Sequence, residues 1–144
     1  MDTYQTINDV LVRLFREIMD QEQKAIITEE FRDITNNDMH IIEAIGIEEP
    51  RNMSSVAKSL SVTVGTLTIA VNALVKKGYV DRVRSEADRR VVLLSLTEKG
   101  EKAYYHHEKF HRDMVDAVIG QLSPEEQVVL AKALTNLSEF FRKF

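Results

Sequence analysis

Cysteine and tryptophan are absent from the 144 residues of this chain, and proline occurs only twice. Without cysteine the chain can form no disulfide, offer no thiolate to a metal and carry out no thiol redox chemistry. No apolar run is long enough to span a bilayer and no secretory leader is apparent, so we expect a cytoplasmic protein. No internal repeat, linker or low-complexity tract appears, and the length supports one domain with a moderate core.

Motifs of catalysis are missing as well. The chain contains no G-x-S-x-G, no glycine-rich phosphate loop and no metalloprotease motif. Its four histidines are the one group with suitable chemistry, and nothing in the sequence places a nucleophile beside them. We therefore expect a protein that is not an enzyme and that needs no cofactor.

Two short amphipathic helices are predicted in the middle of the chain, separated by a tight turn near Ser61. Thr63 has the chemistry to cap the second helix, and Gly78 follows two lysines at its end, as is typical of a helix C-terminus. The apolar residues that carry the helical spacing are Val56, Ala57, Leu60, Val62, Leu67, Val71 and Leu74.

The outer face of the second helix is small and rich in hydroxyl groups, and no carboxylate occurs between Thr63 and Gly78. Such a face can approach DNA closely, donate to phosphates and set methyl groups against thymine methyls. An ordinary solvated face is the alternative, but threonine is a poor helix former, so three exposed threonines favour DNA contact. The candidate DNA-binding residues on this helix are Thr63, Gly65, Thr66 and Thr68.

A β-hairpin with a polar tip is predicted after this helix, with strands at Val80 to Arg84 and Val91 to Leu96. Arginine tolerates insertion into a narrow minor groove and also binds phosphates, whereas most charge runs in loops are merely solvated. Asp88 lies two residues before Arg90 and can orient its guanidinium group. The candidate DNA-binding residues of this loop are Arg84, Asp88, Arg89 and Arg90, with Arg82 nearby.

The charge of the chain is distributed unevenly. The formal net charge is −4, yet residues 54–90 carry seven lysines and arginines against three acids. A basic segment in an acidic chain predicts DNA binding that depends strongly on salt. A protein-interaction module with the same fold is the alternative, although such modules tend to lose arginines in this loop.

The hairpin loop and the ten residues after it resemble a known signature. Asp88, Arg90, Leu96, Thr97 and Gly100 fit the pattern D-x-R-x5-L-T-x-x-G of the MarR family of bacterial transcription regulators. The similarity covers the whole chain in length and helix order. It implies a mostly α fold with a small β-hairpin, namely a winged helix-turn-helix at about residues 35–97, with dimerisation helices at about residues 2–30 and 98–144.

The terminal segments have the pattern of long helices with broad apolar faces. We expect one helix from Asp2 to Glu30, a short one from Asp38 to Ile47, one after the hairpin to about Gln121, and a last one from Pro124 to about Lys143. So much apolar surface near the chain ends predicts a homodimer. A two-fold dimer would set two recognition helices on successive major grooves, so double-stranded DNA with an inverted repeat is the expected operator.

Residues 1–8, 61–92 and 107–115 resemble the branch of this family that represses fatty-acid biosynthesis genes. That resemblance implies that acyl carrier protein bearing a long-chain acyl group is a co-repressor that strengthens operator binding. Arg13, Arg16, Lys24 and Arg32 are candidates for docking the acidic carrier. The same apolar stripe would suit a core or an acyl pocket, and the sequence leaves both open. The candidate ligand-binding residues are Val10, Leu14, Ile18, Phe31, Met39, Tyr104 and Phe110.

A metal site is the remaining alternative. His107 and His111 are four residues apart, a spacing that places both on one face of a helix and can hold a metal ion. Glu22, His40, His107 and His111 are similar to the primary zinc site of the zinc-sensing branch of the MarR family. Hydrogen-bonded histidines of a core or surface are the ordinary alternative, so the sequence leaves the metal open.

Overall fold

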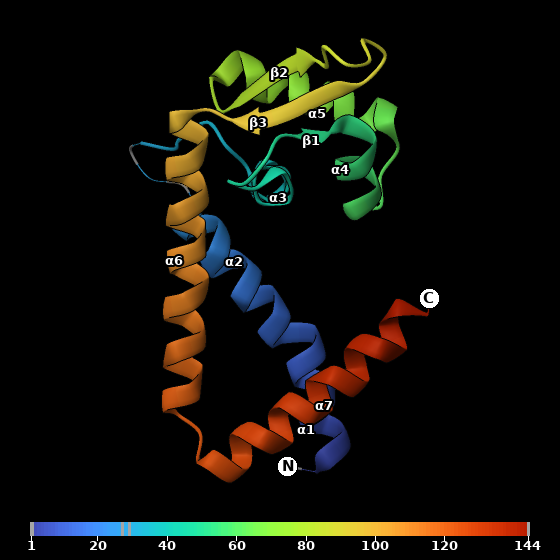
Figure 1. Cartoon of the computed structure of the whole chain (residues 1–144). Coiled ribbons are helices and arrows are strands. Elements are labelled where there is room, and N and C mark those ends of the chain that lie inside the picture. Colours follow the sequence, from blue (N-terminus) through green and yellow to red (C-terminus); the bar gives the residue numbers. More distant parts are fainter. Residues whose placement is uncertain (1, 27, 29, 144) are drawn as a thin grey trace. The chain divides into compact units, whose positions relative to one another are not determined.

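The computed structural model describes residues 2–26, 28 and 30–143. The chain divides into two compact units, residues 1–108 and residues 109–144 (Figure 1). The first unit holds the N-terminal helices and the winged helix-turn-helix. The second holds the last part of a long helix and the C-terminal helix.

Three helical segments form the N-terminal stretch: α1 (Thr3–Asp9), a π-helical turn (Val10–Leu14) and α2 (Phe15–Ile26). The prediction of one helix from Asp2 to Glu30 is therefore wrong at its C-terminal end, where Ile27 and Glu29 lie outside the described residues. The turn at Val10–Leu14 widens the helix, and α2 ends at Ile26. Ile26 is buried, and a turn at residues 30–33 delivers the buried Phe31 to the core. Burial of Phe31 removes its apolar ring from water and stabilises this turn against the core.

Helix α3 (Asn36–Ile45) begins two residues earlier than predicted, because Thr35 and Asp38 form a capping box. The Thr35 hydroxyl accepts from the Asp38 N–H at 3.1 Å, and the Asp38 carboxylate accepts from the Thr35 N–H at 3.1 Å. The helix stops before the predicted Ile47 because Gly46 has a φ of 73°. Its buried apolar residues are Met39, Ile41, Ile42 and Ile45.

Helices α4 (Met53–Ser59) and α5 (Val64–Lys77) form the predicted helix-turn-helix. The Thr63 hydroxyl accepts from the Thr66 N–H at 3.1 Å, which confirms the predicted cap. Gly78 is left-handed with φ 89°, which confirms the predicted stop. In the part of the chain that is described, no single helix is long and apolar enough to cross a membrane. Within the same described residues, one pair of helices, α4 and α5, passes that test when taken together, and the pair is bent by 106°.

The sheet has three antiparallel strands in the order β1 (Arg51–Asn52), β3 (Val92–Leu96), β2 (Val80–Arg84). The predicted hairpin is confirmed as β2 and β3, with Arg82 opposite Leu94. Strand β1 adds to the other edge, with Arg51 also opposite Leu94. A strand of two residues is too short to show an alternating pattern of apolar and polar residues, so the sequence indicated only a loop here.

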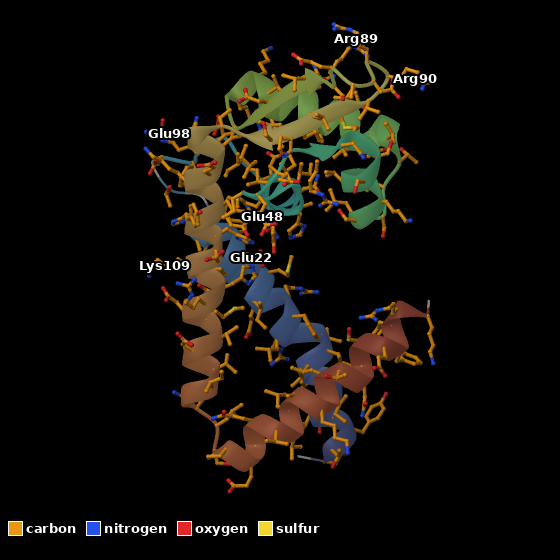
Figure 2. All side chains as sticks on the ribbon, in the orientation of Figure 1. Glu22, Glu48, Arg89, Arg90, Glu98 and Lys109 are labelled. Atoms are coloured by element: carbon orange, nitrogen blue, oxygen red, sulfur yellow. The ribbon has the colours of Figure 1, made fainter. Side chains whose placement is uncertain are left out.

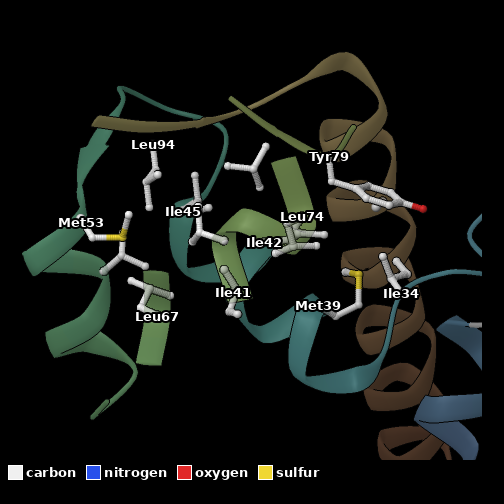
Figure 3. Close-up of a cluster of buried hydrophobic side chains, with 14 of the residues drawn as sticks. Ile34, Met39, Ile41, Ile42, Ile45, Met53, Leu67, Leu74, Tyr79 and Leu94 are labelled. Atoms are coloured by element: carbon white, nitrogen blue, oxygen red, sulfur yellow. The ribbon is translucent and has the colours of Figure 1, made fainter. Parts of the chain in front are cut away.

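The core of the first unit lies between α3, α4, α5 and the sheet (Figure 3). Tyr79 is fully buried at the junction of α5 and β2, and its hydroxyl donates to Asp33 Oδ1 at 2.6 Å. Burial raises the pKa of Tyr79, and the hydrogen bond to Asp33 raises it further. Thr97 ties the start of α6 (Glu98–Gly120) to the same junction, since its hydroxyl donates to the Gly78 carbonyl at 2.6 Å.

In the second unit, α7 (Pro124–Arg142) begins with the predicted Ser123 cap. The Ser123 hydroxyl accepts from the Glu126 N–H at 3.2 Å, and the Glu126 carboxylate accepts from the Ser123 N–H at 2.9 Å. No described residue of α7 is buried. Val128, Val129, Leu134, Leu137, Phe140 and Phe141 are each at least 43% exposed.

Candidate nucleic-acid interface

Helix α5 has one face in the core and one face open to solvent. Leu67, Val71 and Leu74 are buried, while Ile69 on the opposite side is 75% exposed. Thr63, Val64, Gly65 and Thr66 at the start of the helix are exposed, and Thr68 is half-buried. The structure thus brings the four sequence-predicted residues of this helix to its open N-terminal half.

The threonine hydroxyls of α5 form hydrogen bonds within the helix. Thr68 Oγ1 donates to the Val64 carbonyl at 2.7 Å. Thr63 Oγ1 donates to Thr66 Oγ1 at 2.9 Å, in addition to accepting the Thr66 N–H. These bonds fix the side-chain rotamers and occupy the protons of Thr63 and Thr68.

The wing, the loop between β2 and β3, is organised by Asp88. The carboxylate accepts from Arg90 three times, from the backbone N–H, Nε and Nη2, each at 3.1 Å. These bonds hold the pKa of Asp88 below its usual range. Arg84 Nη1 donates to the Arg89 carbonyl at 2.9 Å and closes the loop. The predicted contact between Asp88 and Arg90 is present, and Arg89 and Arg90 lie at the wing tip (Figure 2).

A contact between β2 and α5 was missed by sequence reasoning. The Arg82 guanidinium on β2 donates to the Asn72 side-chain oxygen on the exposed side of α5. Arg82 was noticed as part of the arginine cluster, but its partner lies ten residues away and on another element. The contact links the orientation of β2 to that of α5.

A hollow of about 640 Å³ lies between α5, the wing and the start of α4. Thr68, Arg84 and Arg90 are the predicted site residues that line it. Asn52 also lines it and caps α4, accepting the Ser55 N–H at 2.7 Å. The hollow is therefore lined both by cationic side chains and by the open face of α5. This combination suits a nucleic-acid backbone.

The predicted ligand-binding residues fall into three environments. Phe31 and Met39 are buried together in the core, at 2% and 1% exposure. Val10 and Leu14 lie on the surface of the N-terminal helices, at 39% and 44%. Ile18 and Tyr104 are half-buried, and Phe110, also half-buried, belongs to the second unit. Periodicity identified the apolar side of each helix but not which part of it enters the core.

Two of the four residues of the alternative metal site, Glu22 and His107, lie together in the first unit. Nε2 of His107 lies 3.5 Å from Glu22 Oε1 and 3.5 Å from Glu43 Oε2. Glu22 and His107 are buried, at 5% and 3% exposure. His40 is exposed, and His111 lies four residues after His107 on α6, within the second unit. Glu43 was not among the predicted ligands, because the sequence offered no reason to pair it with His107.

Comparison with known proteins agrees with this geometry. Residues 22–107 match the family described as transcriptional regulator SarA/Rot. The crystal structure of Streptococcus pneumoniae FabT in complex with DNA has a TM-score of 0.91 and 43% identity, over 97% of this chain and 98% of that one. A MarR family transcription regulator, SP03579, has a TM-score of 0.81 at 16% identity, covering 97% of this chain and 90% of that one. The regulator PchR of Bacillus subtilis is 26% identical over 94% of this chain and 88% of its own length.

Proposed function

The chain belongs to the MarR family of winged-helix transcription regulators, and from that premise we propose that it represses fatty-acid biosynthesis genes as a cytoplasmic homodimer. Its relatives are transcription regulators and not enzymes. The fatty-acid assignment is supported by the resemblance of residues 61–92 and 107–115 to that branch. The FabT structure, at 43% identity, is of a protein bound to DNA.

The observation that carries DNA binding is the pairing of α5 with the arginine wing. Helix α5 exposes its N-terminal half without a carboxylate, so negative phosphates meet no like charge there. In the proposed complex the start of α5 enters the major groove and contacts the adjoining phosphates, through Thr63, Gly65, Thr66 and Thr68. Arg84, Arg89 and Arg90, oriented by Asp88, serve the minor groove and the backbone.

Exposed apolar side chains support the homodimer. In the first unit Ile7, Leu11 and Phe15 are 41–53% exposed. In the second unit the apolar residues of α7 are exposed along the whole helix. Exposed apolar residues in such number are typical of an interaction site. A second copy that covers these surfaces would pair two recognition helices, so the operator would be an inverted repeat.

The proposed co-repressor is acyl carrier protein loaded with a long acyl chain. An acyl group that binds better to one spacing of the two recognition helices would shift the dimer toward that spacing. Arg13, Arg16, Lys24 and Arg32 are all exposed and are candidates for the acidic carrier protein. Charge reversal at Arg13 and Arg16 should then abolish the enhancement of DNA binding by the carrier.

A titration of labelled inverted-repeat duplex tests the whole proposal. Binding should weaken steeply between low and moderate salt, because arginines displace counterions from phosphates. It should strengthen when acyl-loaded carrier protein is added, and the carrier without its acyl group is the matched control. Binding without salt dependence would contradict the DNA assignment, and equal effects of loaded and unloaded carrier would contradict the co-repressor.

Zinc sensing is a second candidate, favoured by the contacts of His107. Two ligands bound to zinc at about 2.1 Å in tetrahedral geometry lie about 3.4 Å apart. The distances of 3.5 Å from His107 Nε2 to Glu22 and Glu43 match that separation. Under this proposal Glu22 and His107 would hold the ion, with Glu43, His40 and His111 as further candidates. Repeating the titration with zinc and with a chelator separates the two functions, since only a zinc sensor should respond.

A further inference from the structure

Ile69 is an exposed apolar residue in the middle of the recognition helix. Its side chain is 75% exposed, the largest exposure among the bulky apolar residues of α5. The fold gains little from it, because an apolar side chain left in water contributes almost none of its transfer free energy. Helical spacing places Gly65, Asn72 and Ala73 on the same side of α5 as Ile69.

The hydroxyl groups beside Ile69 are engaged within the helix. Thr68 donates to the Val64 carbonyl at 2.7 Å, and Thr63 donates to Thr66 at 2.9 Å. With these rotamers fixed, donation from Thr63 or Thr68 to a base would require breaking an existing bond. Two of the three threonine hydroxyls near Ile69 are therefore less able to donate to a base than the sequence indicated.

Gly65 adds an independent observation. Its φ is not positive, and a Cβ placed there would meet only Thr63 Oγ1, at an ordinary 3.9 Å. The fold would accept alanine, which favours a helix by about 1 kcal/mol over glycine. A glycine that the fold does not need, one turn before Ile69, leaves room for a bulky partner to approach the helix axis.

We propose that Ile69 determines sequence specificity by packing against thymine methyl groups in the major groove. This inference rests on the proposed binding to duplex DNA. The thymine C5-methyl is the apolar group that the major groove displays, and it distinguishes a T·A pair from the others. The exposed Arg90 of the wing lines one hollow with Thr68, the neighbour of Ile69 in the chain, and can attract the DNA backbone there. Gly65 permits the close approach that a methyl contact requires.

The test compares thymine with uracil, which lacks only the C5-methyl group. A duplex is first selected by the wild-type protein from a random-sequence pool and is then resynthesised with deoxyuridine at each thymine in turn. Loss of one buried methyl should weaken wild-type binding about fourfold at the contacted thymines. The variant Ile69→Ala should bind the thymine and uracil duplexes with equal affinity.

Ile47→Ala is the matched control, because it removes the same atoms from a half-exposed loop residue outside α5. It should keep the wild-type ratio between thymine and uracil duplexes. Helical content by circular dichroism and binding to non-specific duplex at low salt verify that each variant is folded.

The outcomes separate the two proposals. Failure of the wild-type protein to bind any duplex overturns the proposed function. Tight binding with equal affinity for thymine and uracil duplexes overturns the role of Ile69 alone, as does a selected site without thymine. Discrimination that persists in Ile69→Ala also overturns it.

Discussion

Replacing Gly100 by alanine should destabilise the protein. A Cβ at this position would lie 2.1 Å from the Tyr79 carbonyl oxygen, 3.1 Å from its carbonyl carbon and 3.2 Å from Leu96 Cβ. The oxygen cannot move away without disturbing the Thr97 N–H, which donates to it at 3.0 Å, or the fully buried Tyr79 side chain. The start of α6 would have to shift away from the junction of α5 and β2.

The expected size of the effect is the balance of two opposing contributions. Overpacking a filled site costs about 1–3 kcal/mol, and a clash with backbone belongs at the upper end. Alanine favours the helix by about 1 kcal/mol over glycine. The net loss in the free energy of unfolding should therefore be about 2 kcal/mol.

Urea unfolding followed by circular dichroism measures this difference. All samples need one protein concentration, because the proposed homodimer would make the stability depend on it. Gly120→Ala is the matched control on the same helix, since a Cβ there meets nothing within 4 Å and the φ is not positive. It should change stability by less than about 1 kcal/mol. If Gly100→Ala were as stable as Gly120→Ala, the close approach of α6 to Tyr79 would be wrong.

Three further predictions concern the wing, the contact between β2 and α5, and the core. Arg90→Ala should weaken binding to every duplex and reduce the salt slope by about one in a fluorescence titration, and unchanged affinity would refute its role. Arg82→Ala and Asn72→Ala should each weaken operator binding, and the double variant should bind no more weakly than either single variant. If the losses in binding free energy were additive, the contact between the two side chains would not matter. Tyr79→Phe should lower the free energy of unfolding by about 1 kcal/mol at pH 7, since Asp33 is exposed and regains water. The Tyr79 hydroxyl holds the pKa of Asp33 below its usual value, so the loss of stability in Tyr79→Phe should shrink as the pH falls through that pKa. Urea unfolding at pH 7 and pH 3 measures this change. A loss of stability that does not depend on pH would count against the hydrogen bond.

Local features of this protein could be predicted because the two residues that form each hydrogen bond lie within one turn of the chain. Thr63 caps the N–H of Thr66, and Ser123 forms a box with Glu126, each across three residues. The bond between Asp88 and Arg90 spans two. Residue type and spacing determine such contacts almost by themselves, which is why the helix-turn-helix and the wing could be recognised.

Contacts between distant residues were decided by the tertiary structure. Tyr79 reaches Asp33 across 46 positions, and Arg51 pairs with Leu94 at the sheet edge. Periodicity also could not tell that Phe31 enters the core while Val10 stays exposed, since both lie on apolar stripes. The sequence by itself determined the recognition helix, its caps and the arginine wing, because these depend on neighbours along the chain. Which apolar face is buried, and which polar groups meet, depended on how the elements pack, and no pattern within a single element contains that information.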